Sequence, residues 1–413
     1  MIKTQKIFLT FLLIFNISCI NAQTLDYFIK QGLTNSPLLK DYQNQINSTS
    51  LDSLLVNSSR MPQVVLNGQL MAAPEYNHFG YDDAITNGGN YSGLVSVSQP
   101  VFNRKTLGNK YESISIQKRS LANTSKILTH DLIRAITNQY LTAYVDFSDL
   151  QFNHVFFKLL QSELDIIQKL VSQGIYKQTD YLSLLIENQS LEMLIQQLNG
   201  QYEKDIRLLN QICGLNDTID YKLAIPEIEK KELSNPILSP LFMQYILDSL
   251  QITNEKKSVE NRYRPKINWF ADAGFNSSKF LGIYQHFGYS AGINISIPIY
   301  DGNQRKYETE KLSMSEDSRY HYESFYKNQY TTQLKQLIGE LNVSNEITEK
   351  LKKKLTTAEE LLSLSKKQLN YGNISITEFL NSLKNYNATN HDLSQSQIKT
   401  LMIVNELDYL MQQ

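Results

Sequence analysis

The sequence predicts a mainly α-helical protein that also carries four β-strands and is built as an internal tandem repeat. Three observations support this fold class: two long proline-free stretches, motifs repeated at a constant spacing, and short segments that alternate with a period of two. The nine prolines of the 413 residues stand at positions 37, 62, 74, 100, 226, 236, 240, 265 and 298. Because proline breaks helix interiors, the proline-free stretches 101–225 and 299–413 are where long helices are expected.

The repeat is visible in paired motifs. Three pairs of equivalent residues are each 198 residues apart: Pro100 and Pro298, Gly174 and Gly372, and Asp180 and Glu378. Asn35-Ser36-Pro37 also has an echo in Ser234-Asn235-Pro236, 199 residues later. Equal offsets mean that the two halves run between these landmarks without net insertion, so a duplication with halves 23–225 and 226–413 is expected.

The segment 1–22 is interpreted as a secretory signal peptide. Lys3 and Lys6 precede the apolar run 7–15, and Ala22 provides a small residue for cleavage before Gln23. A membrane anchor is the alternative, but the run is short for a spanning helix. A lipoprotein signal using Cys19 is the weaker interpretation, because Asn16 stands where an aliphatic residue is usual. With Cys19 removed, Cys213 is alone and no internal disulfide is expected.

Each half then follows one plan of helix, two strands and long helical hairpin. Helix-like segments at about 24–60 and 237–262 stop before Pro62 and Pro265. Strands are expected at about 62–72 and 92–100 in the first half, and at about 265–275 and 288–298 in the second. The helical hairpins follow at about 102–214 and 300–413.

Period-two alternation identifies the strands. In 288–298, apolar residues alternate with small polar ones: Tyr289, Ala291, Ile293, Ile295 and Ile297 against Ser290, Gly292, Asn294 and Ser296. Such alternation places one set on each face of a sheet, and about ten residues suffice for a tilted membrane-spanning strand. An ordinary sheet that packs one face on a soluble core would show the same pattern. The neighbouring aromatics fit either an interfacial girdle or ordinary loops: Tyr76, Phe79, Tyr81, Tyr91, Phe280, Tyr284 and Phe287.

The long helices show the spacing of a coiled coil. One stripe follows alternating steps of three and four residues: Ile133, Ile136, Tyr140, Ala143, Phe147 and Leu150. The region 103–173 would form about 100 Å of helix at 1.5 Å per residue. The sequence therefore predicts an elongated coiled-coil body. Four strands alone cannot close a membrane barrel, so strands that span a membrane require several copies to share one.

The full pattern resembles the TolC-like outer-membrane efflux protein family over about residues 24–413. The marks are Ser98-Gln99-Pro100-Val101-Phe102, where a strand meets its long helix, and the run from Tyr371 to Asn381. The resemblance implies a homotrimer in the outer membrane, whose strands close one transmembrane β-barrel of twelve strands above a long α-helical coiled-coil barrel. It also implies a periplasmic adaptor protein and an inner-membrane pump as partners.

The resemblance places the glycine motifs at the periplasmic tip of the helical barrel. The candidate gate residues are Gly174 and Asp180 in the first half, and Gly372, Glu378 and Asn381 in the second. Carboxylates repeated around an axis would favour cations and influence gating. Helix capping explains Asp180 and Glu378 equally well, since Ser375 and Glu378 have the spacing of a capping box. Gly174 and Gly372 most simply provide a backbone conformation that other residues resist.

No catalytic motif, cofactor motif or metal-ligand spacing is recognised, so neither an enzyme nor a cofactor is predicted. The six histidines are scattered, at positions 78, 130, 154, 286, 321 and 391. The net charge of −1 gives no reason to expect nucleic acid, and Lys352-Lys353-Lys354 is interpreted as a solvated helix face.

The expected function is a passive outer-membrane exit duct for small-molecule efflux or for type I protein secretion. The sequence does not separate these two cargoes, because the pump chooses the cargo. The alternative from another class is a soluble periplasmic coiled-coil adaptor or scaffold protein.

Overall fold

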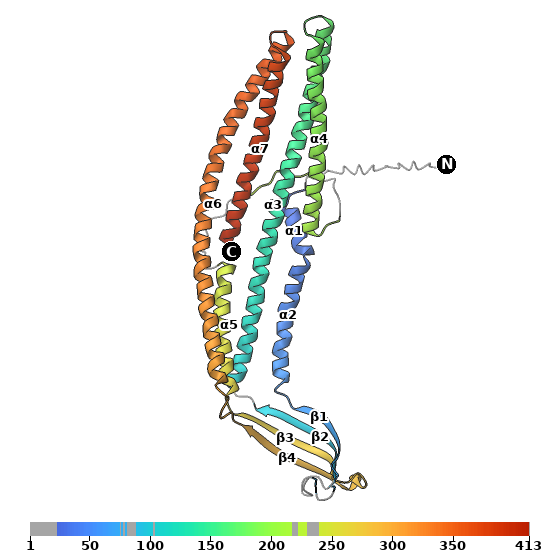
Figure 1. Ribbon diagram of the computed structural model, residues 1–413, viewed down its shortest axis with the longest axis vertical. Coiled ribbons are helices and arrows are strands. Elements are labelled where there is room, and N and C mark those ends of the chain that lie inside the picture. The colour runs from blue at the N-terminus through green and yellow to red at the C-terminus, as the bar shows by residue number, and fades with distance from the viewer. Residues whose placement is uncertain are drawn as a thin grey trace, which may run out of the picture. The chain divides into compact units, whose positions relative to one another are not determined.

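A computed structural model describes residues 23–74, 76, 79–80, 88–101, 104–216, 222–228 and 239–412 (Figure 1). The expected signal segment with Cys19 lies outside the described residues. So do Tyr81, Phe102 and the motif Ser234-Asn235-Pro236. The chain forms two compact units. Unit 1 comprises Met1–Ser36, Asp131–Glu232 and Leu334–Leu410, and unit 2 comprises Pro37–His130, Leu233–Gln333 and Met411–Gln413.

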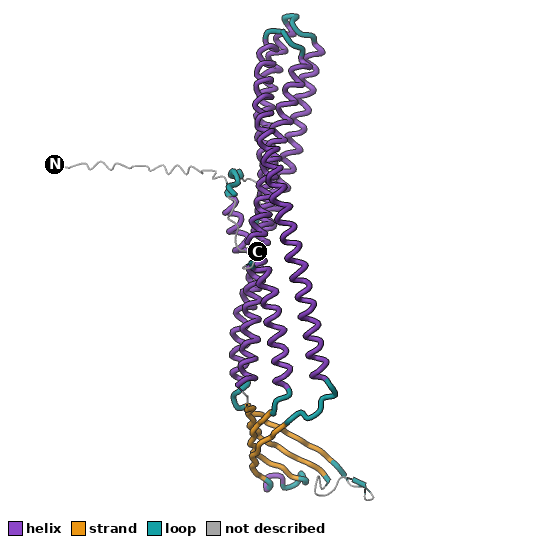
Figure 2. Tube along the Cα trace, turned by 90° about the vertical axis from the view of Figure 1, so that its left-hand side faces the viewer, coloured by secondary structure: helices purple, strands orange, loops and turns teal. Residues whose placement is uncertain are grey.

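Unit 2 contains one antiparallel sheet in the order β1-β2-β3-β4 (orange in Figure 2). The strands are β1 Gln63–Ala72, β2 Gly89–Val101, β3 Lys266–Ser277 and β4 Phe287–Ser296. Each overlaps a segment that the alternation predicts. β4 ends two residues before position 298, where proline could not donate a ladder hydrogen bond. The predicted class, long paired helices with four strands, is confirmed.

The register of the sheet separates two faces of different chemistry. Residues directly opposite in an antiparallel pair point to the same face, so Leu66, Val95, Ala273 and Tyr289 share one face. The rest of this mainly apolar face is as follows: Val64, Gly68, Leu70, Ala72, Gly89, Tyr91, Gly93, Val97, Gln99, Val101, Ile267, Trp269, Ala271, Phe275, Ser277, Phe287, Ala291, Ile293 and Ile295. The opposite face is mainly small and polar: Gln63, Val65, Asn67, Gln69, Met71, Asn90, Ser92, Leu94, Ser96, Ser98, Pro100, Lys266, Asn268, Phe270, Asp272, Gly274, Asn276, Gly288, Ser290, Gly292, Asn294 and Ser296.

The expected first helix at 24–60 is wrong as one element. Two helices cover this range, α1 Leu25–Asn35 and α2 Pro37–Ser58. The break falls at Ser36 because the residue before proline is driven out of the helical region. Pro37 then opens α2, where its missing N–H group is not needed. α1 belongs to unit 1 and α2 to unit 2.

Polar side chains tie together the helices of unit 2. α5 Pro240–Arg262 packs beside the first part of α3 Arg104–Ser172. Asn109 of α3 donates to the backbone oxygen of Asn254 at 2.9 Å, and Asn123 donates to that of Pro240 at 2.7 Å. α6 Gln304–Asn370 contributes Arg319, which bonds to the Tyr245 backbone oxygen of α5. These buried amides find partners, as burial of polar groups requires.

Unit 1 has its core between α1, α3 and α4 Gln178–Cys213. The predicted coiled-coil stripe is largely confirmed: Ile136, Tyr140, Ala143 and Leu150 are buried in this core, and Phe147 packs against it. Their partners include Phe28, Tyr202, Ile206 and Leu209. Cys213 is buried in the same cluster and contacts the Phe28 backbone oxygen at 3.4 Å. Burial raises the pKa of its thiol to about 11, which suits a packed rather than a reactive cysteine.

The second hairpin, α6 with α7 Ile376–Gln412, is joined by hydroxyl groups as well as apolar side chains. Ser344 pairs with Thr400 at 2.8 Å, and Thr348 with Ser396 at 2.7 Å. Small hydroxyl side chains let the two helices approach closely while satisfying each other's hydrogen bonds. Among the described helices, none is both long and apolar enough to cross a membrane.

Candidate functional site

The two turns that close the helical hairpins of unit 1 have the same backbone structure. Gly174 ends α3 with φ of 75°, and Gly372 ends α6 with φ of 72°. In the first turn, Ile175 N–H donates to Leu170 at 2.9 Å; in the second, Asn373 N–H donates to Gln368 at 2.9 Å. These bonds close a helix end whose last residue is left-handed, a conformation that glycine adopts without steric cost.

The candidate carboxylates both lie in the first turn of the helix that follows. Asp180 accepts from the Lys177 N–H group at 3.0 Å, and Glu378 accepts from the Ser375 N–H group at 3.0 Å. Ser375 completes a capping box, since its hydroxyl accepts from Glu378 N–H at 3.2 Å. Lys177 carries no acceptor oxygen, so the first repeat keeps only half of that box. Capping is therefore a structural role of both carboxylates.

Asn381 lies one helical turn beyond Glu378, so both side chains share one face of α7. Both are exposed, whereas Asp180 is half-buried. The five candidate residues thus fall on two turns and the helix starts that follow them.

The two turns contact each other through Tyr176, which the sequence analysis did not single out. Its hydroxyl lies 2.9 Å from the backbone oxygen of Leu369 and 2.9 Å from that of Ile374. Ile175 packs against the second turn, where a Cβ added to Gly372 would lie 3.0 Å from its methyl group. Burial, and secondarily the carboxylate of Asp180, raises the pKa of Tyr176, so its hydroxyl remains a donor.

An apolar cluster beneath the turns draws on all four helices. Its buried members are Phe156, Leu160, Leu164, Ile167, Leu184, Leu191, Leu369, Ile376, Phe379 and Leu383. Two ion pairs add to it: Lys384 of α7 with Glu187 of α4 at 2.9 Å, and Lys366 of α6 with the fully buried Glu163 of α3 at 2.7 Å. Since a buried carboxylate without its partner is costly, the second pair holds the hairpins in one register.

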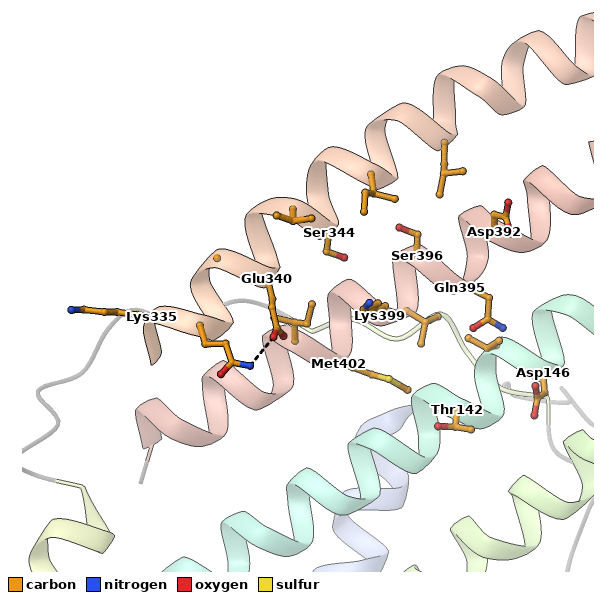
Figure 3. Close-up of a pocket in the computed structure, with 18 residues that line it drawn as sticks. Thr142, Asp146, Lys335, Glu340, Ser344, Asp392, Gln395, Ser396, Lys399 and Met402 are labelled. Carbon is orange, nitrogen blue, oxygen red and sulfur yellow. Dashed lines mark hydrogen bonds between the residues drawn. The ribbon is translucent and has the colours of Figure 1, made fainter. Parts of the chain in front are cut away.

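A groove of about 1020 Å³ lies between α3, α6 and α7 in unit 1 (Figure 3). Its floor is apolar and includes Val145, Val343 and Met402, while Lys335 and Lys399 are among its charged lining residues. Asp146 of α3 also lines it (Figure 3). The groove joins elements of both repeats and brings together no catalytic set of side chains.

Asp146 is half-buried and pairs with the buried carboxyl group of Asp205. Burial, a hydrogen bond to Asp205 and repulsion from Asp205 and Asp149 raise the pKa of Asp146 to about 8. Asp205 accepts hydrogen bonds at both side-chain oxygens, from Gln139 at 3.2 Å and from Gln201 at 2.8 Å. Asp146 therefore carries the proton at neutral pH and links α3 to α4.

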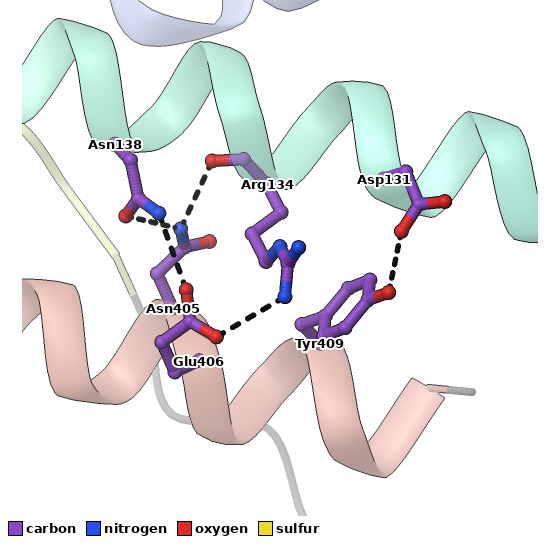
Figure 4. A network of polar contacts seen from close by, with 6 residues as sticks. All are labelled: Asp131, Arg134, Asn138, Asn405, Glu406 and Tyr409. Atoms are coloured by element: carbon purple, nitrogen blue, oxygen red, sulfur yellow. Dashed lines mark hydrogen bonds and ion pairs between the residues drawn. The ribbon is translucent and has the colours of Figure 1, made fainter.

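The end of α7 is fastened to α3 by a polar network (Figure 4). Glu406 binds Arg134 at 3.3 Å and accepts from Asn138 at 3.2 Å. The Arg134 guanidinium also lies 3.8 Å from the ring centroid of Tyr409, whose hydroxyl donates to Asp131. A cation over an aromatic ring and a shared carboxylate both favour one orientation of the helix end.

Within the described ranges, no three histidine, cysteine or acidic side chains gather in a way that could hold a metal ion. His391 does contact Asp149, at 2.8 Å, but the two form a pair rather than a ligand set. The site is thus composed of capping groups, helix turns and ties between hairpins.

No protein-family model and no curated protein sequence matches the chain. Solved structures do match. CusC, described in terms of transmembrane channel formation, superposes with a TM-score of 0.77 at 12% identity, over 94% of this chain and 91% of that one. The outer membrane channel CmeC of Campylobacter jejuni gives 0.75 at 11% identity, over 95% of this chain and 86% of that one.

The outer membrane protein VceC of Vibrio cholerae gives a TM-score of 0.74 at 10% identity, over 94% of this chain and 96% of that one. At identities this low, the structural matches establish that the fold is shared. The expected resemblance is confirmed at that level, and the chain has the fold of the TolC-like outer-membrane efflux channels.

Proposed function

We propose that the chain is the subunit of an outer-membrane exit duct, which conducts small molecules or proteins passively from the periplasm to the exterior. The observation that carries this proposal is the two-faced, four-stranded sheet with two open edges. Its apolar face is far more exposed than a soluble sheet tolerates: Leu66 is 75% exposed, Leu70 77% and Tyr289 89%. Exposed apolar surface of this extent, opposite a polar face, fits strands between lipid and water.

The open edges supply the argument for assembly. β1 and β4 each pair on one side only. In a bilayer, unpaired backbone groups cost several kcal/mol each, so the sheet must close on itself or on copies. Four strands are too few for closure, since membrane barrels begin at about eight. β4 of one copy is therefore proposed to pair with β1 of the next, and three copies would give the homotrimer that the family resemblance suggests.

The helices that adjoin these edges carry matching apolar stripes. α2 leads into β1 and exposes Leu51, Leu54 and Leu55. α6 follows β4 and exposes Tyr307 and Met314 at a similar distance from the sheet. If β4 pairs with β1 of the next copy, α6 comes beside α2 of that copy and both stripes are covered. The same contact that closes the sheet thus removes apolar surface from water.

Aromatic side chains near one end of the sheet support its placement in a membrane. Tyr76 and Phe79 follow β1, while Phe280 and Tyr284 lie between β3 and β4, and each is largely exposed. Tyr91 packs edge-on against Phe280, with ring centroids 5.6 Å apart. Rings in this position serve as an interfacial girdle. The paired strands also favour the duct over a soluble coiled-coil adaptor or scaffold, which has no need of them.

Export, the source of energy and the cargo of the duct belong to the same proposal. Export by the segment 1–22 delivers the chain to the periplasm. An adaptor protein and an inner-membrane pump supply energy, since no nucleotide-binding motif is recognised in the sequence. The duct itself performs no catalysis. Small-molecule efflux and type I secretion both fit the channel, because cargo is selected at the pump.

The turns of unit 1 are proposed as the gated periplasmic entrance. Glu378 and Asp180 would present carboxylates, and Asn381 an amide, around the axis of the trimer. Tyr176 would hold the two turns of each copy together in the closed state. Opening then requires the Tyr176 bonds and the Lys384–Glu187 ion pair to break.

Cell fractionation tests this function directly. The protein is expected in the outer-membrane fraction and to leave it only with detergent. The purified particle, reconstituted in a planar bilayer, should then give discrete channel currents. Release from the cells by osmotic shock, as a protein that stays in solution without detergent, would support the scaffold alternative instead.

A further inference from the structure

Asp272 stands in the middle of β3, on the polar face of the sheet. Its register partners are Ser96 on β2 and Ser290 on β4. The Ser290 hydroxyl donates to the carboxylate at 3.4 Å. Asn67 donates to Ser96 at 3.1 Å on the neighbouring strands, so this part of the face is lined by small polar groups.

Asp272 is the only acidic residue within the four strands. The one other charged strand residue is Lys266, which opens β3 on the same face. Charges placed on the lipid side of a membrane strand destabilise it, most strongly near the bilayer midplane. The positions of Asp272 and Lys266 therefore favour this face, rather than the apolar one, as the face in contact with water.

The space beside Asp272 is kept free of side chains. The next pair on the same face is Gly274 with Gly288. A Cβ on Gly274 would lie 2.1 Å from the Gly93 backbone oxygen, and its φ is 154°, so no larger residue fits there. A Cβ on Gly288 would have open space around it. The carboxylate is thus uncovered on this side and reachable by ions.

On the other side, the aromatic ring of Phe270 lies across its register partner Gly292, where an added Cβ would be 2.7 Å from the ring. The ring therefore fills the place that a side chain at position 292 would take. On this face, Asp272 thus lies between the pair Gly274 and Gly288 and the ring of Phe270. The residues directly beside it on the neighbouring strands are Ser96 and Ser290.

We propose that Asp272, one from each copy, forms a negatively charged ring inside the shared barrel and adds to the preference of the open duct for cations. This inference rests on the proposed duct function. Carboxylate rings select cations because the local potential raises cation and lowers anion concentration at a constriction. The ring would lie in the barrel, apart from the carboxylates of the helix turns.

The test is the reversal potential of purified channels in a planar bilayer under a KCl gradient. Asp272→Asn should lower the potassium-to-chloride permeability ratio at least about twofold near 0.01 M salt, where the Debye length is about 30 Å. The difference should disappear near 1 M salt, where that length is about 3 Å. Asp272→Glu should retain the wild-type ratio.

Three further variants show whether the charge of Asp272 itself sets the selectivity. Ser290→Ala removes the hydrogen bond but keeps the charge, so the ratio should not change. Lys266→Gln removes a positive charge from the same face and should raise the ratio. Glu378→Gln tests whether the selectivity arises at the helix turns instead.

The outcomes are distinguishable. Channel currents with equal selectivity for wild type and Asp272→Asn would overturn the ring and leave the duct intact. Loss of selectivity only in Glu378→Gln would likewise overturn it. Absence of any current from wild-type protein would contradict the duct, and the ring with it.

Discussion

The hydroxyl of Tyr176 lies 2.9 Å from the backbone oxygen of Ile374, the residue that occupies the same position in the second repeat, 198 residues later. Equivalent positions of the two halves therefore meet at the two turns. The hydroxyl has one proton and two acceptors within reach, since Leu369 also lies at 2.9 Å. One side chain thus connects both hairpins at the proposed entrance.

Tyr176→Phe is expected to loosen this connection. The change removes the hydroxyl and leaves the ring, so the cost to folding should be about 1 kcal/mol, typical of one hydrogen bond. If the turns form the gate, the variant should spend more time open. Single-channel recording in planar bilayers measures the open fraction directly.

Tyr371→Phe is the matched control, because Tyr371 stands in the second turn with 81% of its surface exposed. Its open fraction should equal that of wild type. Equal open fractions for wild type and Tyr176→Phe would show that the Tyr176 bonds do not hold the entrance closed.

Glu378→Ala separates gating from capping. Loss of a capping carboxylate should cost about 0.5–2 kcal/mol, and Ser375→Ala should cost a similar amount. Only Glu378→Ala removes a charge, so it alone should change conductance and cation selectivity. Thermal unfolding and single-channel recording of both variants check the two effects. Unchanged conductance and selectivity in Glu378→Ala would leave capping as the sole role of this residue.

The carboxyl pair of Asp146 and Asp205 predicts a decline of stability with rising pH. The pKa of Asp146 is raised from 3.8 to about 8 in the folded protein, so the native state binds this proton more tightly than the unfolded state. The contribution is complete below about pH 4 and is lost as the pH rises to about 8. Asp149 contributes to the stability with the same sign, because burial raises the pKa of its carboxyl group. The positive charge of Lys204 acts in the opposite direction, because it lowers the pKa of Asp146.

Asp146→Asn should flatten this dependence, because the amide stays neutral and can still donate to Asp205. Urea midpoints at about pH 5 and pH 9 measure the difference. Asp392→Asn is the control, since Asp392 lines the same groove but is exposed. A slope in Asp146→Asn as steep as that of wild type would mean that the pair does not hold a shared proton.

Gly174→Ala should destabilise the first turn, whereas Gly200→Ala should not. Gly174 has φ of 75°, and the left-handed conformation costs other residues about 1–2 kcal/mol. Gly200 lies inside α4 with open space around it, so alanine there should stabilise the helix by about 0.5–1 kcal/mol. Opposite shifts in thermal midpoint are expected. Equal shifts would contradict the assigned role of the Gly174 conformation.

The sequence was sufficient for the fold because its signals are local and repeated. Alternation in 288–298 indicates a strand with one apolar and one polar face, and the absence of proline permits helices as long as α3 and α6. The pair Gly174 and Gly372 marks both turns, since each must supply a left-handed residue. The capping roles of Asp180 and Glu378 are predictable for the same reason, because a capping box involves residues only three positions apart.

The features that were missed depend on packing between distant segments. Tyr176 gives no sign in the sequence that its hydroxyl reaches Ile374, and Asp146 does not show that Asp205 lies beside it. Glu163 belongs to an ordinary amphipathic pattern, yet the fold buries it completely. The break at Ser36 is different, because Pro37 is a local signal that ends one helix before it and can open the next. Contacts between repeats cannot be derived from periodicity alone.

The measurement that tests the central claim most directly is the mass of the particle extracted from outer membranes in detergent. Closure of the sheet by copies predicts a detergent-dependent particle of about three chain masses, held together by β4 of one copy and β1 of the next. A monomer in detergent, or a monomer that is stable in water without it, would contradict a shared barrel.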